Sequence, residues 1–276
     1  MALRLIDAGH RVVVWGRTAQ RLAPALEAGA TAAGSPAELA AECEAVLLCV
    51  TDGDAVEDVV FGPRGVAEGA RRGSLIVDHS TIHPETTRQA ARRLADAGVG
   101  WVDAPVSGGA AGATAATLSV FFGGEPADVE RASGWVTAYA GNVTHMGPVG
   151  SGQVAKSCNQ AIVASTVGIW AEVISYARRC GIDPDLLVDA LAGGWADSAI
   201  REAHAHDMVA GRFRRAPGLI ILKDLDIVGD MARAQAAPMP VSSAVTTLFR
   251  LLLAQGRETG GLGAIMQLYE APPGRT

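Results

Sequence analysis

One segment of the chain combines a lysine with two carboxamides at helical spacing. It reads Gly150-Ser-Gly-Gln-Val-Ala-Lys156-Ser-Cys-Asn159-Gln160, so Lys156, Asn159 and Gln160 lie at i, i+3 and i+4 on one helical face. A lysine can exchange a proton with a carbonyl or hydroxyl oxygen, and the amides can hold that oxygen in place. A solvated face of an amphipathic helix has the same residue types, so both interpretations stay open at this point.

Apolar or small side chains recur along a different face of the same predicted helix. They step by three or four residues, the helical period, through Val154, Cys158, Ala161, Ser165, Ile169, Val173, Tyr176 and Cys180. We expect this stripe to face the core, and this orientation turns Lys156 away from the core.

A second segment has the features of an anion-binding loop. In Asp103-Ala-Pro-Val-Ser107-Gly108-Gly109 a predicted strand ends, and a hydroxyl and two glycines follow. Backbone N–H groups without side-chain obstruction can wrap a carboxylate. A flexible hairpin turn is the alternative, and we favour the anion loop.

Three further segments have polar side chains where a nucleotide could bind. Arg17-Thr18 follows the strand at 11–15, and an arginine at that position accommodates a 2′-phosphate, which favours NADP(H), although a surface arginine in a helix-start turn fits equally well. The hydroxyls of Ser80 and Thr81 follow another strand, where capping the next helix is the favoured interpretation. Lys223 and the acidic residues after it form, in isolation, a surface charge cluster.

Alternating strands and helices in the first half must position these segments. Unbroken apolar runs of strand length predict a parallel sheet covered by helices on both faces, which is a doubly wound, Rossmann-type α/β domain. The predicted strands are 11–15, 45–50, 74–78, 101–104, 118–122 and 142–145, and the predicted helices are 18–28, a helix capped by Ser35 and Glu38, 84–97 and 128–139.

After Gly150 the strand patterns stop. A helix is predicted over 152–180, and shorter helices over 185–191, 196–210, 222–236 and 241–255. We therefore divide the chain into an α/β domain, 1–149, and an all-α domain, 150–276.

The start of the chain has the pattern of the end of a helix. Met1–His10 resembles two helical turns with Gly9 as the cap, followed directly by a strand. In a dinucleotide-binding βαβ unit a first strand and a G-x-G-x-x-G loop come before such a helix. We expect both to lie upstream of Met1, and we expect the sheet without them to have an open slot.

Composition limits the class of protein. The 276 residues are 49% hydrophobic and 19% charged, with a net charge of −6 and no basic stripe, which argues against nucleic acid as a partner. The longest apolar stretch, 161–174, contains three polar residues and is shorter than the roughly 20 residues of a membrane span. Four dispersed cysteines and the spacing of His204 and His206 suggest neither a disulfide framework nor a metal site, and they fit a cytoplasmic protein.

Taken together, the motifs resemble those of the β-hydroxyacid dehydrogenases, the family of 3-hydroxyisobutyrate dehydrogenase and tartronate semialdehyde reductase. The resemblance spans nearly the whole chain and is most specific in the fourth and fifth of six blocks. In chain order these blocks are GHRVVVWGRT, LLCVTD, VDHSTI, DAPVSGGAAGATAATLSVFFGG, GSGQVAKSCNQ and KDLDI.

The resemblance implies an NAD(P)-dependent oxidoreductase that acts on a small 3-hydroxy acid or its semialdehyde. It also implies a homodimer, built by the all-α domain, or a higher homo-oligomer. It implies Lys156 as the catalytic acid–base, and Ser107, Gly108, Gly109, Asn159 and Gln160 as substrate-binding residues. It assigns the cofactor, NADP or NAD, to Arg17, Thr18, Val50, Thr51, Thr81 and Lys223.

Two alternatives follow from departures in the pattern. Imine reductases are similar in fold and in the Arg17-Thr18 element but typically lack the lysine, so Lys156 favours the hydroxyacid dehydrogenases. The absence of a glycine loop before Met1 leaves a non-catalytic dimeric relative with impaired cofactor binding as the other alternative.

Overall fold

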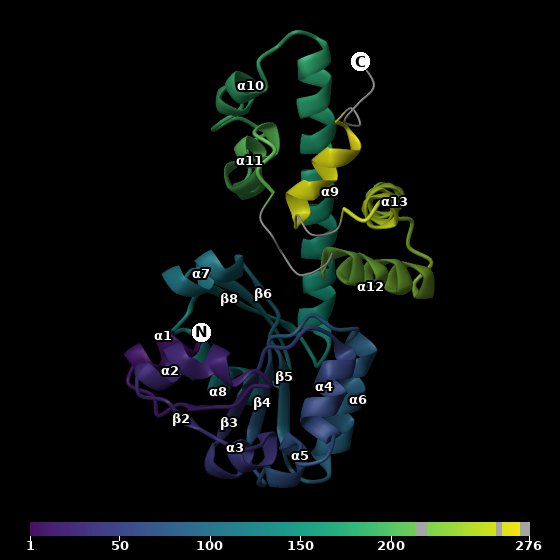
Figure 1. The fold of residues 1–276 in the computed structure, drawn as a ribbon. Helices are drawn as coiled ribbons and strands as arrows, with labels where there is room; N and C mark the ends of the chain where they lie inside the picture. Colours follow the sequence, from purple (N-terminus) through teal and green to yellow (C-terminus); the bar gives the residue numbers. More distant parts are fainter. Residues whose placement is uncertain (214–219, 258–260, 271–276) are drawn as a thin grey trace. The chain divides into compact units, whose positions relative to one another are not determined.

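The computed structural model describes residues 1–213, 220–257 and 261–270, which form two compact units (Figure 1). Unit 1 comprises Met1–Lys156 and unit 2 comprises Ser157–Thr276. The parts of the predicted all-α domain at 214–219, 258–260 and 271–276 lie outside the described residues.

Unit 1 is built on a six-stranded sheet in which β3, β4 and β5 are parallel neighbours. β4 is buried at all four positions because it lies between two strands and beneath helices on both faces. The strands are β3 (Ala45–Leu48), β4 (Leu75–Asp78), β5 (Gly100–Asp103), β6 (Val106–Ser107), β7 (Leu118–Gly123) and β8 (Ala140–Gly147).

The prediction of a parallel sheet was wrong at β7. β7 runs antiparallel to both β5 and β6, and pairs with β8 in parallel. The physical reason is the short connection: β6 follows β5 after Pro105, and the chain then returns beside β6 with Val106 opposite Val120. The resulting sheet is mixed.

Helices cover both faces of this sheet, which confirms the doubly wound class (Figure 1). Alternate side chains of β4 enter two separate cores, with Ile76 in one and Leu75 and Val77 in the other. The first core includes side chains of α3 (Pro36–Glu42), α4 (Gly53–Phe61), α5 (Val66–Gly69) and α6 (Pro84–Ala95), and the second includes those of α1 (Ala2–Asp7) and α8 (Pro126–Val136).

Local signals explain where two of these helices begin. The hydroxyl of Ser35 accepts the backbone N–H of Glu38 at 3.1 Å, so the predicted cap of α3 is confirmed. The helix predicted over 18–28 is instead a 3₁₀ turn, Ala19–Leu22, followed by α2, Ala23–Glu27. Pro24 lacks an N–H and fits only the first turn of an α-helix, so the α-helix begins there.

A gap interrupts the strands near the start of the chain. Within the part of the chain that the structure describes, β1 (Val13–Val14) pairs with β2 (Thr31–Ala32) alone, as a separate two-stranded parallel sheet. Residues 12–15, which include β1, and residues 45–50, which include β3, line one cavity of about 950 Å³. The gap lies between the strands where the sequence predicted an open slot, whereas an upstream strand and glycine loop remain a prediction.

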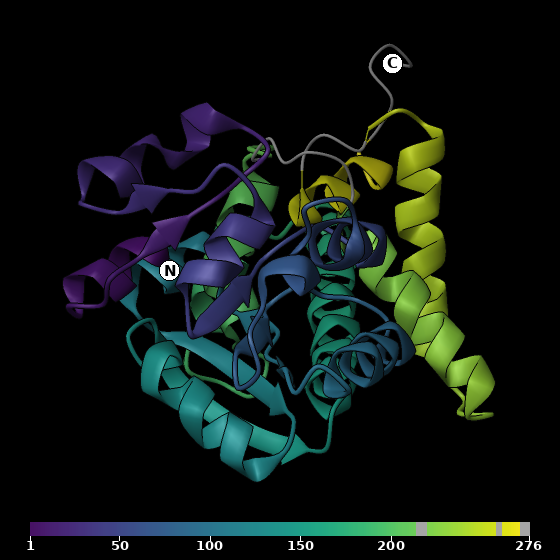
Figure 2. The same ribbon diagram turned by 90° about the horizontal axis from the view of Figure 1, so that it is seen from below.

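Unit 2 consists of helices and connecting turns, with no strand among its described residues, and has its own apolar core. α9 (Ser151–Arg179) begins in unit 1 and, at about 1.5 Å per residue, is about 43 Å long. The other helices are α10 (Pro184–Ala190), α11 (His206–Val209), α12 (Ile220–Ala234), α13 (Pro240–Ala254) and a 3₁₀ helix, Leu262–Leu268. α12 and α13 pack against each other (Figure 2). None of the helices described in the structure is long and apolar enough to span a membrane.

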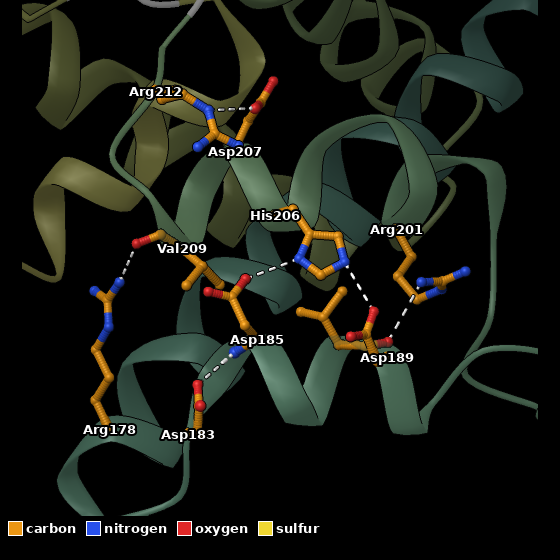
Figure 3. Close-up of polar contacts among 10 residues, drawn as sticks. Arg178, Asp183, Asp185, Asp189, Arg201, His206, Asp207, Val209 and Arg212 are labelled. Carbon is orange, nitrogen blue, oxygen red and sulfur yellow. Dashed lines mark hydrogen bonds and ion pairs between the residues drawn. The ribbon is translucent and has the colours of Figure 1, made fainter.

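The helix predicted over 196–210 is shorter than expected and irregular. A π-helical turn, Arg201–Ala205, leads into α11, and a polar cluster ties α11 to α10 (Figure 3). The imidazole of His206 contacts the carboxylates of Asp185 at 2.8 Å and Asp189 at 3.0 Å, and the hydrogen bond to Asp185 contributes most to raising the pKa of His206. His206 therefore joins two helices.

Candidate active site

The carboxylate of Asp103 holds the first turn of α9. Asp103 is the last residue of β5 and is fully buried. Its Oδ1 accepts the backbone N–H of Gly150 at 2.7 Å, and its Oδ2 accepts that of Gln153 at 2.9 Å. Burial raises the pKa of Asp103 to about 6, although these backbone hydrogen bonds oppose the shift. One side chain thus joins the end of β5 to the start of α9.

A second buried side chain joins α9 to the loop after β4. The amide nitrogen of Gln153 donates to the carbonyl of Ser80 at 2.8 Å, and its oxygen accepts the N–H of Ile82 at 3.2 Å. The Ser80 hydroxyl in turn accepts the N–H of Val50, just beyond β3, at 3.0 Å. The ends of β3, β4 and β5 are therefore all connected to one helical turn.

Lys156 lies one turn after Gln153 and only 7% of it is exposed. It is one of two lysines in the chain, beside 21 arginines, and the other is Lys223. The expectation that the stripe through Val154 and Cys158 faces the core was wrong, because both are exposed. The buried face of α9 instead contains Gln153 and Lys156 at the start of the helix, where these polar groups have hydrogen-bonding partners. In unit 2 it contains Ala164, Ala171 and Ile174.

The loop of Ser107, Gly108 and Gly109 connects β6 to α7 (Gly109–Ala115). Gly108 and Gly109 have φ angles of +120° and +62°, which glycine adopts without strain. Both glycines are exposed and Ser107 is half-buried. The loop therefore presents backbone groups without side chains, as the prediction requires.

Four of the residues predicted to bind the cofactor come together around the cavity beside β1 and β3. Arg17, Thr18, Val50 and Thr51 all line it. The Thr51 hydroxyl donates at 3.0 Å to the carboxylate of Asp52, the residue that caps α4. Thr81 is half-buried and does not line this cavity.

The helix after Thr81 is not capped in the way that the sequence suggested. The favoured interpretation, a cap from Ser80 or Thr81, was wrong because His83 caps α6 through its Nδ1, which accepts the N–H of Glu85 at 3.1 Å. The Ser80 hydroxyl is instead used to hold Val50.

His79 and Tyr139 form a buried pair that the sequence did not single out. Nδ1 of His79 donates to the carbonyl of Ala104 at 2.6 Å, so Nε2 accepts the Tyr139 hydroxyl at 2.8 Å. Burial lowers the pKa of His79 to about 4, which keeps the ring neutral at pH 7. His79 also lines the cavity. The sequence offered one signal for His79, its position directly after the apolar strand 74–78.

In unit 2, a buried aspartate connects two of the motifs. The amide of Gln160 donates to Oδ2 of Asp224 at 2.6 Å, and the Lys223 ammonium lies 3.0 Å from Oδ1. Asp224 is buried, so the interpretation of this segment as a surface charge cluster was wrong for it. Asn159 is half-buried on α9 next to Gln160.

The residues that line the cavity fit a nucleotide cofactor. Arg17 is exposed and lines the cavity, so its guanidinium is accessible to a phosphate. Val50 and Thr51 lie beyond the carboxyl end of β3, the edge where ligands bind in such sheets.

Comparison with known proteins identifies the family. Residues 1–147 match the NAD-binding domain of 6-phosphogluconate dehydrogenase, and residues 150–269 match the NAD-binding domain of NADP-dependent 3-hydroxyisobutyrate dehydrogenase. The chain belongs to the β-hydroxyacid dehydrogenase family. A relative in this family, 2-hydroxy-3-oxopropionate reductase of Escherichia coli, is 34% identical over 275 residues, which are 98% of this chain and 92% of that protein.

Solved structures agree with this membership. The β-hydroxyacid dehydrogenase described as 3-hydroxyisobutyrate dehydrogenase from Salmonella typhimurium superposes with a TM-score of 0.89 at 28% identity, covering 97% of this chain and 94% of the other. An imine reductase from Pseudomonas sp. gives a TM-score of 0.59 at 17% identity, covering 98% and 94%, and shares the fold alone.

Proposed function

We propose that this chain is an NADP(H)-preferring dehydrogenase that interconverts a small 3-hydroxy acid and its semialdehyde. The observation that carries the proposal is the buried Lys156, on a helical turn that is joined to the ends of three parallel strands. Family membership supports the reaction class, and the substrate's identity is part of the proposal.

Lys156 is the proton-transfer group in this proposal. In oxidation the neutral amine takes the proton of the substrate hydroxyl, and in reduction the ammonium returns a proton to the carbonyl oxygen. A bound nicotinamide cofactor accepts or supplies the hydride. Low exposure of Lys156 keeps bulk water from competing for the proton.

Substrate binding is assigned to two groups of residues. The loop of Ser107, Gly108 and Gly109 offers N–H groups and a hydroxyl to the substrate carboxylate, and its exposed glycines support that role. Asn159 and Gln160, on the turn after Lys156, orient the substrate, and the bond from Gln160 to Asp224 fixes its amide.

Cofactor binding is assigned to Arg17, Thr18, Val50, Thr51, Thr81 and Lys223. The exposed guanidinium of Arg17 supports a preference for the 2′-phosphate of NADP(H) over NAD(H). We place the domain boundary at 149/150, and we propose a reducing, cytoplasmic location because all four cysteines, each among the described residues, are free thiols.

We also propose a homodimer that buries the exposed stripe of α9. Ile162, Ile169 and Tyr176 recur every seven residues and are 67%, 52% and 70% exposed. Such spacing suits helix pairing. Ile169→Glu should convert a dimer to a monomer in light-scattering measurements, and a monomeric wild type contradicts this part of the proposal.

Steady-state turnover on a panel of hydroxy acids, semialdehydes and cyclic imines tests the function. Lys156→Ala should lower kcat by about two orders of magnitude or more, the scale of a lost acid–base group. Arg17→Ala should weaken NADPH binding and leave NADH binding little changed. Turnover of imines alone favours the imine reductase alternative, and no binding of NADPH favours the non-catalytic relative.

A further inference from the structure

We propose that Asp103 and Gln153 are positioning residues that set the orientation of the Lys156 side chain by fixing the first turn of α9. The inference rests on the proposed role of Lys156 in proton transfer. Neither Asp103 nor Gln153 is among the residues that we propose to bind substrate or cofactor.

The Asp103 carboxylate suits this task better than a neutral side chain. The first N–H groups of a helix have no partner within the helix, and Asp103 accepts two of them, from Gly150 and Gln153, with separate oxygens. Its negative charge also interacts favourably with the positive end of the helix dipole. An asparagine has one acceptor oxygen, and its NH₂ group would face the second N–H.

The first turn of α9 packs too closely against the backbone of β5 and β7 to shift freely. A Cβ built at Gly152 would lie 2.3 Å from the carbonyl oxygen of Phe121 and 2.8 Å from that of Asp103. A Cβ at Gly123 would lie 2.5 Å from the Asp103 carboxylate. Backbone therefore packs directly on backbone, and a change at Asp103 must displace the turn itself.

Gln153 supplies a second, independent attachment. Its amide makes a donor and an acceptor bond to the loop of Ser80 and Ile82, while Asp103 reaches the same turn from β5. Gln153 and Lys156 are three residues apart, so they are neighbours on the helix surface. Two strand ends thus determine both the position and the rotation of the turn that carries Lys156.

The rate of proton transfer depends on how accurately the reacting group is positioned. Misplacement of a reacting group by about 1 Å can lower the rate about 100-fold. We therefore expect Asp103→Asn and Gln153→Met to lower kcat by about 10- to 100-fold, while the KM for NADPH changes less than about twofold. Gln153→Met keeps the side-chain length and removes both hydrogen bonds.

Ser35→Ala is the matched control for a general loss of stability. It removes a helix cap in the same unit, the bond from the Glu38 N–H to the Ser35 hydroxyl at 3.1 Å. This variant should lose stability and keep kcat. If it loses as much kcat as the Asp103 variant, Asp103 has only a structural role and the proposal is wrong.

The scarcity of lysine provides a readout that does not depend on turnover. Protein labelled with ¹³C-lysine contains two labelled side chains, Lys156 and Lys223, and Lys223→Arg assigns their Cε signals. Asp103→Asn and Gln153→Met should shift or broaden the Lys156 signal and leave that of Lys223 in place. An unmoved Lys156 signal together with wild-type kcat in a folded variant overturns the proposal.

The two readouts separate this inference from the proposed function. If wild type turns over no substrate of the panel but the Lys156 signal still responds selectively, the positioning stands and the function fails. If Asp103→Asn does not fold, Gln153→Met decides the question by the same two measurements.

Discussion

Acidification from pH 7 to pH 5 should act on two buried groups in opposite directions. Burial lowers the pKa of His79 from 6.5 to about 4, so the unfolded chain takes up this proton first and stability falls as the pH drops below 6.5. Burial raises the pKa of Asp103 from 3.8 to about 6, so the folded chain takes up this proton first and stability rises as the pH drops below about 6.

These shifts determine the expected magnitudes. Proton linkage between pH 7 and pH 5 removes about 2 kcal/mol of unfolding free energy through His79 and adds about 1 kcal/mol through Asp103. The two effects offset each other in part, which leaves a net loss of about 1 kcal/mol in the wild type. They separate when either group is replaced by an amide that does not titrate.

The assay is urea denaturation of wild type, His79→Gln and Asp103→Asn, with each protein compared with itself at the two pH values. His79→Gln should lose about 2 kcal/mol less than wild type on acidification, and Asp103→Asn about 1 kcal/mol more. Other titrating groups contribute equally to all three proteins. An identical pH response of His79→Gln and wild type would refute the reasoning about the buried imidazole.

Three further changes test other parts of the structure. Gly152→Ala should lower the unfolding free energy by about 1–3 kcal/mol, because the added Cβ would meet the backbone of β7. Gly134 is exposed on α8 with open space around it, so Gly134→Ala should raise the unfolding free energy by up to about 1 kcal/mol in the same denaturation assay. Ser107→Ala should raise the KM for carboxylate substrates and leave kcat nearly unchanged, so equal loss in both would contradict a binding role. A Val/Ile-rich strand and glycine loop of about 15 residues added before Met1 should raise both the melting temperature and the affinity for NADPH, measured by calorimetry, and no gain in either would refute a strand-accepting gap.

Local patterns predicted the longer strands of unit 1 and the helices α3, α6 and α8, because apolar runs and caps act over a few residues. The helices α4, α5 and α7 were not predicted. β4 was expected over 74–78 and is observed at Leu75–Asp78. The direction of β7 depends on how the chain returns after Pro105, and periodicity carries no information on that return. The longer strands were therefore predictable from the sequence, whereas the two-residue strands β2 and β6 were missed and the sheet topology was predicted only in part.

The candidate site shows a similar division. The motifs around Lys156 and Ser107 could be found because their residue types and spacing are unusual, but the face that α9 buries could not. Its polar start is buried only because Asp103 and the Ser80 loop supply partners from distant segments. Asp224 likewise acquires its role from a contact with Gln160, 64 residues away in the chain.

The separate sheet of β1 and β2 should also open more readily than the centre of the main sheet of unit 1. β1 is held to β2 by a short ladder that includes the bond from the Thr31 N–H to the Val12 carbonyl, whereas β4 is paired on both sides. Local openings of a folded protein range from nearly zero free energy to that of global unfolding. Amide hydrogens of β1 should therefore exchange with solvent well before those of β4. Arg17 lies three residues after β1. In the proposed function, the choice between the two cofactors therefore depends on a residue next to a strand that is less protected than β4, and binding there includes the entropy of ordering it.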